Sequence, residues 1–318
     1  MHRRKQARTP GRRKAFTLIE LVVVIAILVI LTGMVLAKLD VFEMKANKGV
    51  AAANMSDVAR AVMQYRALTT TYPDGWDSLL DQAGHLPQSS PATPTTPAVP
   101  GLHGELTGGP PFQGNPVELT TGTLLNGEIQ SLGREGINTL YDFPGTKPTD
   151  YQAWTDIPGN MPGSAPNLAR TLSSLINGTT PNAPSTATVA RLNTSMTLPG
   201  DGVTLQTITP STDPRNKADT VVADIYKTAG GGVIVPLNKS LVVVGFGQFN
   251  QAVGNRSQNS LMPQAPFYPN ENQVTLYNRF LCVFETDVTG VRARLVAVLG
   301  ADGDRMDDEI GDYYATAP

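Results

Sequence analysis

The chain has little of what a catalytic or disulfide-bonded protein needs. It contains one cysteine, Cys282, and three histidines among 318 residues. A single cysteine excludes an intramolecular disulfide, and its apolar neighbours predict a buried strand thiol. Only His85 and His103 follow the first fifteen residues, and we interpret both as solvated loop histidines because they lack metal-ligand spacing. A nucleophile with a placed base is not evident, so we predict no enzyme and keep a membrane-anchored hydrolase as a remote alternative.

Charge is also scarce, and it is unevenly distributed. Charged residues make up 16% of the chain, and residues 1–15 carry seven of its 25 basic side chains but no acidic one. The remaining chain has 18 basic and 27 acidic side chains, and is therefore strongly negative. Because phosphate contacts need a basic face, we predict that nucleic acid is not a partner.

Proline is absent between Pro10 and Pro73, although the whole chain has 25 prolines. Residues 16–37 are apolar except for Glu20, and a helix of this length would span about 33 Å, close to the hydrocarbon core of a bilayer. The basic residues before it predict a cytoplasmic N-terminus by the positive-inside rule. We therefore expect a single-pass protein of the cytoplasmic membrane, with its bulk on the periplasmic or extracellular side.

The helix is expected to continue beyond the membrane. Apolar residues recur at spacings of three and four from about Lys38 to Leu68, the pattern of an amphipathic helix lying against a globular head. One helix of some fifty residues is thus predicted. The turn signal at 72–75 should end it and begin a short helix that reaches Leu80.

The start of this helix resembles a known processing signal. A basic leader, the small residue Ala15 and then Phe16-Thr17-Leu18-Ile19-Glu20-Leu21 are similar to the class III signal of type IV pilins and type II secretion pseudopilins. The resemblance implies that a prepilin peptidase cuts between Ala15 and Phe16 and methylates the new amine of Phe16. It also implies that identical or related pilin subunits form a helical filament on an inner-membrane assembly platform.

Glu20 has a physical reason to need a partner in such a helix. A carboxylate within an apolar membrane helix costs about 2.5–3.5 kcal/mol on insertion scales. The amine of Phe16 would be a cation at the same depth, and the family resemblance implies that Glu20 neutralises this amine on a neighbouring subunit during assembly. The alternative is a carboxyl group that is protonated or reaches the interface.

The rest of the chain divides by composition. Residues 85–225 are rich in Pro, Thr and Gly and predict a loop-rich insertion with a short helix near 168–176. The last ninety residues predict strands at 233–237, 241–246, 279–285 and 291–299, the last two forming a hairpin. The expected fold is therefore α+β and pilin-like, with the long helix packed on an antiparallel sheet. Its expected segments are 1–15 (leader), 16–37 (membrane half of the helix), 38–84 (amphipathic helix and turn), 85–225 (insertion) and 226–318 (sheet and acidic loop).

Six acidic residues fall between positions 302 and 312. Calcium takes six to eight oxygen ligands, which carboxylates and loop carbonyls of such a stretch can supply. The sequence from Leu299 resembles the C-terminal calcium loop of major pseudopilins, which implies a calcium site; a solvated acidic turn is the alternative. The ligands we predict are Asp302, Asp304, Asp307, Asp308 and the carbonyl of Leu299.

These observations together favour a structural subunit of a type II secretion pseudopilus, most like its major pseudopilin. The alternative within the same family is a type IV pilus major or minor pilin, whose Pro/Thr-rich insertion would face outward as an adhesive surface.

Overall fold

The computed structural model describes most of the chain after the leader. The described residues are 18–88, 101–109, 112–143, 169–196, 205–213, 215–254, 257–269 and 276–314; within helix α1, the side chains of residues 34–38, 40 and 41 are left out. Ala15 and Phe16 lie outside these residues, as does the Pro-rich stretch 89–100.

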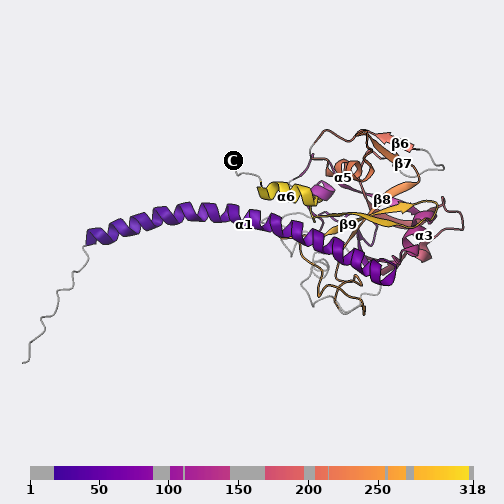
Figure 1. The fold of residues 1–318 in the computed structure, drawn as a ribbon, viewed down its shortest axis with the longest axis horizontal. Coiled ribbons are helices and arrows are strands. Elements are labelled where there is room, and N and C mark those ends of the chain that lie inside the picture. The colour runs from indigo at the N-terminus through magenta and orange to yellow at the C-terminus, as the bar shows by residue number, and fades with distance from the viewer. Residues whose placement is uncertain are drawn as a thin grey trace, which may run out of the picture.

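The molecule is built on one long helix. Helix α1 runs from Leu18 to Thr69, 52 residues, which confirms the prediction of a single helix of about fifty residues. Its N-terminal part projects away from the head, and its C-terminal part lies along the head (Figure 1). The buried positions are spaced by three and four residues, as an amphipathic helix requires: Ala51, Met55, Val58, Val62 and Tyr65.

The described helices were compared with what a membrane crossing needs. Within the residues that the structure covers, no helix combines enough length with enough apolarity to cross a membrane. The predicted span 16–37 extends beyond this set at both ends.

The main sheet has eight strands and is mostly antiparallel. Its central path is β10-β9-β8-β1-β3-β4, and β5 joins β8 while β2 pairs with β5. The strands are β1 (Trp76–Asp81), β2 (Leu119–Leu125), β3 (Thr139–Phe143), β4 (Ala169–Thr171), β5 (Pro184–Leu192), β8 (Lys239–Gly245), β9 (Leu281–Asp287) and β10 (Arg294–Leu299). The α+β, pilin-like fold class is confirmed. The purely antiparallel sheet needs one correction, because β1 and β3 pair in parallel.

The predicted short helix after the turn is wrong. Residues 76–81 form strand β1, whose side chains are all buried. Trp76 packs with the core under α1, whereas Leu79 and Leu80 belong to the core on the opposite face of the sheet. Burial on both sides favours a central strand, and this tertiary environment overrides the local helix signal.

The strands predicted near the C-terminus are present, with two qualifications. Strands β8, β9 and β10 pair as expected, the last two as a hairpin. Strand β7 (Val233–Pro236) instead pairs with β6 (Leu205–Ile208) in a separate two-stranded sheet. The buried thiol of Cys282 lies in β9, as predicted.

The main sheet extends further back in the sequence than its pattern indicated. Residues 85–225 contain β2, β3, β4 and β5, together with the helices α2 (Gly104–Thr107), α3 (Asn126–Arg134), η1 (Leu172–Leu175) and α5 (Lys217–Tyr226). Strand β5 pairs with β8 at Ala190–Val243 and Arg191–Val242. Short strands in a Thr-rich sequence have weak apolar periodicity, so their partners were not apparent before folding.

The sheet separates two cores. Val242 and Val244 of β8 pack toward α1, while Leu241 and Val243 alternate toward α5. Helix α6 (Met306–Tyr314) follows β10 and packs beside α1 (Figure 1). The end of the chain is thereby brought next to the middle of its first helix.

Candidate functional site

The projecting part of α1 presents an almost continuous apolar surface. Its large side chains from Leu18 to Leu31 are between 50% and 82% exposed. Glu20 lies on this segment and is itself exposed. Such a surface marks a site of contact with apolar partners, because soluble monomers rarely leave so many large apolar side chains in water.

A second feature is a buried carboxylate cluster at the C-terminal end of the sheet. We use this name for Asp302, Asp304 and Glu309, which offer carboxylate oxygens within 4.8 Å of one another. All three residues are buried. Among the described residues they form the group of acidic, His or Cys side chains suited to holding a metal ion.

The turn between β10 and α6 places the first two carboxylates. The amide of Gly300 donates to the carbonyl of Asp304 at 2.7 Å, which closes the turn. Gly303 adopts a φ of 92°, a conformation that favours glycine. A Cβ at Gly300 would lie 2.6 Å from Oδ1 of Asp302, so the backbone approaches the carboxylate too closely for a larger residue.

Helix α6 decides which further acid joins them. Its first turn contains Asp307, Asp308 and Glu309, and Glu309 points inward. Arg305 instead pairs with Asp307 at 2.9 Å and with Asp308 at 3.0 Å. The structure therefore replaces the predicted ligands Asp307 and Asp308 by Glu309. Residue Leu299 pairs with Arg305 in an isolated bridge at the start of the turn.

Two lysines from distant segments reach the cluster. Nζ of Lys48, on α1, lies 3.3 Å from Asp304, 3.1 Å from Glu309 and 3.6 Å from Asp312. Lys217, at the start of α5, pairs with Asp304 and Glu105. The cluster thus joins α1, α5 and α6, and neither lysine was predicted because sequence separation gives no signal for such contacts.

The carboxyl groups titrate differently according to their surroundings. Burial and then the charge of Asp304 raise the pKa of Asp302, and burial also raises the pKa of Glu309. For Asp304 burial acts in the same direction, but Lys217 and Lys48 outweigh it and lower its pKa. Asp304 is therefore the carboxylate best fitted to stay ionised.

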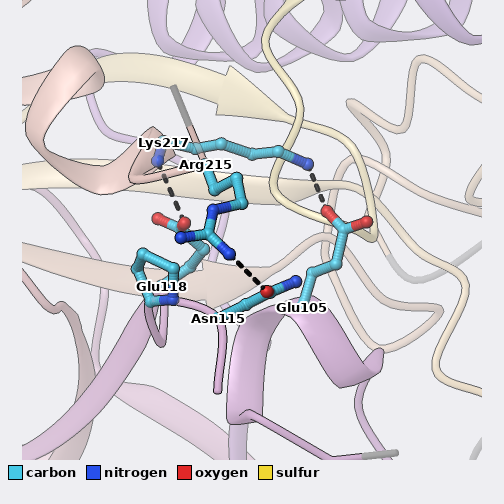
Figure 2. A pocket seen from close by; sticks show the side chains of 6 residues that line it. Glu105, Asn115, Glu118, Arg215 and Lys217 are labelled. Atoms are coloured by element: carbon cyan, nitrogen blue, oxygen red, sulfur yellow. Dashed lines mark hydrogen bonds and ion pairs between the residues drawn. The ribbon is translucent and has the colours of Figure 1, made fainter. Parts of the chain in front are cut away.

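A polar pocket of about 170 Å³ adjoins the cluster. It is lined by Glu105, Asn115, Pro116, Glu118, Arg215 and Lys217. The backbone amide of Lys217 donates to Glu118, while its side chain reaches across to Glu105 (Figure 2). Burial raises the pKa of Glu118 to about 7. Lys217 thereby connects the pocket with the carboxylate cluster.

One histidine lies closer to this site than predicted. His103 precedes α2, and its ring is 5.1 Å from that of Phe112. Burial lowers its pKa, and the charges of Asp302 and Glu105 act against this effect. The prediction of a solvated loop histidine is therefore wrong for His103, because folding brings α2 against the acidic turn.

The carboxylate cluster was compared with the requirements of calcium, which the sequence resemblance implies. Its donors are hard oxygens, and Oε2 of the buried Glu309 receives no hydrogen bond and has only the ion pair with Lys48. The residues therefore fit calcium if an ammonium group leaves.

Comparison with known proteins places the N-terminal segment. Residues 10–36 match the family model described as the prokaryotic N-terminal methylation motif. This match confirms the predicted type of processing signal and covers only that short part of the chain. No curated protein and no solved structure matches the sequence.

Proposed function

We propose that this chain, which carries a prokaryotic N-terminal methylation motif, is a structural subunit of a type II secretion pseudopilus. A prepilin peptidase cuts between Ala15 and Phe16 and methylates Phe16. Residues 16–37 anchor the precursor in the inner membrane, with the leader in the cytoplasm and the head outside. The observation that carries this proposal is the exposed apolar surface of α1 directly after the motif.

Assembly follows from where that surface can be buried. The projecting helix can remain in lipid or pack with the same helices of neighbouring subunits on the assembly platform. In the filament, Glu20 pairs with the Phe16 amine of a neighbour, which removes two unpaired charges from an apolar bundle at once. The head remains outside the bundle and carries the sheet.

The processing step is tested by the mass of the N-terminal peptide of protein purified from its own host. The expected chain begins at methylated Phe16. A chain that retains residues 1–15 would contradict the proposal, because the Phe16 amine would not exist.

The assembly step is tested by Glu20→Ala, with Glu43→Ala on the same helix as the control. We expect filaments to be lost with the first variant and kept with the second, by electron microscopy of sheared material. Unchanged filament yield with Glu20→Ala would contradict the role of Glu20. Deletion of the gene in the host separates the two filament systems, since lost secretion indicates a pseudopilus and lost surface fibres indicate a pilus.

We also propose that the carboxylate cluster binds calcium through Asp302, Asp304 and Glu309. The density of buried carboxylate oxygens supports this proposal. A ligand that binds only the folded state raises its stability, so the melting temperature should be higher in calcium chloride than in EGTA. Equal melting temperatures would contradict calcium binding and leave the filament proposal intact.

A further inference from the structure

The oxygens of the carboxylate cluster all have partners within the chain. Asp302 accepts the amide of Asp304 at 3.1 Å through Oδ1 and contacts the Tyr268 hydroxyl at 2.6 Å through Oδ2. Asp304 pairs with Lys217 through Oδ1 and with Lys48 through Oδ2. Glu309 contacts the Tyr268 hydroxyl through Oε1 and Lys48 through Oε2. The cluster is therefore neutralised from inside the protein.

Lys48 occupies the position that a metal ion would need. Its Nζ lies between Asp304 and Glu309, two of the three carboxylates that could act as ligands. A calcium ion at this place would bring two positive charges next to the ammonium group, in surroundings that screen charge poorly. The ion and the ammonium group of Lys48 cannot both sit on these oxygens.

We propose that Lys48 is the internal counter-ion of the carboxylate cluster, and that calcium binds by displacing its ammonium group. This inference rests on the proposed calcium site and adds a regulatory property to it. Ion binding at Asp304 and Glu309 is then coupled to α1, because the displaced side chain belongs to that helix.

The surrounding contacts limit how far the change spreads. Next to Lys48, a Cβ at Gly49 would lie 3.3 Å from the Tyr313 ring, so α1 and α6 are already in close contact there. This contact does not depend on the ammonium group. Displacement therefore releases a side chain and its ion pairs, while α6 stays packed on α1.

The test compares calcium affinity in full-length mature chains held in detergent micelles. The variants are Lys48→Met, Lys48→Arg and the matched control Lys45→Met, a lysine one turn earlier on α1. Calcium chloride is titrated by calorimetry, and thermal unfolding is recorded in calcium and in EGTA. Magnesium chloride serves as the control for unspecific charge screening.

The expected result is a change of affinity that depends on charge at position 48. Lys48→Met should bind calcium at least about tenfold more tightly than the natural chain, because no cation has to leave. It should also melt lower in EGTA and recover in calcium, which a purely structural lysine would not show. Lys45→Met and Lys48→Arg should keep the natural affinity within a factor of about three.

Two outcomes would overturn the proposal. Equal calcium affinity in the natural chain and Lys48→Met would show that the ion and the ammonium group do not compete. Absence of calcium binding in every variant would remove the calcium site as well, while the filament experiments with Glu20 stand independently. If Lys48→Met fails to fold in both buffers, Lys217→Met replaces it, since that lysine holds the other oxygen of Asp304 and the same tightening is expected.

Discussion

Asp77 is a buried carboxyl group at the centre of the sheet. It accepts a hydrogen bond from the Tyr277 hydroxyl at 2.8 Å, and a Cβ at Gly247 would lie only 2.0 Å from its Oδ2. Burial raises its pKa to about 7, although Tyr277 and the charge of Arg279 act in the opposite direction. The folded chain therefore keeps a proton that the unfolded chain releases near pH 4.

This shift predicts how stability depends on pH. The contribution of Asp77 is most favourable below pH 4 and is lost as the pH rises from about 4 to about 7. Replacing Asp77 by Asn keeps the acceptor for Tyr277 but removes the titration. We expect the variant to gain relative to the natural chain by at most about 4 kcal/mol between pH 4 and pH 8.

Denaturant unfolding at several pH values measures this difference, and Asp57→Asn on the exposed face of α1 is the control. Curves for Asp77→Asn and the natural chain that stay parallel from pH 4 to pH 8 would contradict the prediction.

At the scale of secondary structure elements, a buried ion pair connects the middle of the chain to the C-terminal strands. Arg191 of β5 pairs with Glu128 of α3 at 2.8 Å, and both side chains are almost completely buried. Ser240 of β8 and Thr286 of β9 also bond to Glu128. Burial alone would raise the pKa of Glu128, but Arg191 outweighs it, so its pKa is lowered.

Arg191→Met should therefore destabilise the head by about 3–5 kcal/mol at neutral pH, because it leaves a charged Glu128 buried without its partner. The loss should be smaller in acid, since the contribution of a carboxylate with a lowered pKa disappears as the pH falls through that pKa. Arg60→Met, at an exposed pair on α1, should change the free energy of unfolding by less than about 1 kcal/mol.

The same measurement on Arg191→Met with Glu128→Leu separates the pair from the packing. The double variant should recover part of the lost stability, because the uncompensated charge is gone. A single variant within about 1 kcal/mol of the natural chain would show that Arg191 does not compensate Glu128.

For the whole molecule, the separation between a projecting apolar helix and a folded head determines how it can associate. Leu28 on the projecting segment and Met63 beside the head are exposed to similar extents, 55% and 48%. The proposed assembly buries Leu28 in a helical bundle. Burial of Met63 is not required by the same model.

Leu28→Lys should therefore abolish filaments, since a lysine in an apolar bundle costs several kcal/mol for each subunit. Met63→Lys introduces the same charge on the same helix and should leave filament yield unchanged. Electron microscopy of sheared filaments, with the amount of membrane-bound subunit as reference, checks both. Normal filaments with Leu28→Lys would argue against assembly through this segment.

Local sequence was sufficient for several predictions because the relevant signals are short in range. The absence of proline and the spacing of Val58, Val62 and Tyr65 predicted α1, and the apolar runs predicted β8 and β9. The segment matched by the methylation-motif model was found from contiguous residues, since processing enzymes read extended sequence rather than a folded surface. Six acids near the C-terminus likewise indicated where carboxylates would gather.

The tertiary structure decided what depends on distant residues. It turned residues 76–81 into a strand, because the sheet is covered on both faces there, and brought β5 against β8. It selected Glu309 rather than Asp307 and Asp308, since helical rotation directs one acid inward and leaves two beside Arg305. It also brought Lys48 to the cluster across more than 250 residues of sequence, a contact fixed by packing between α1 and α6 rather than by any local pattern.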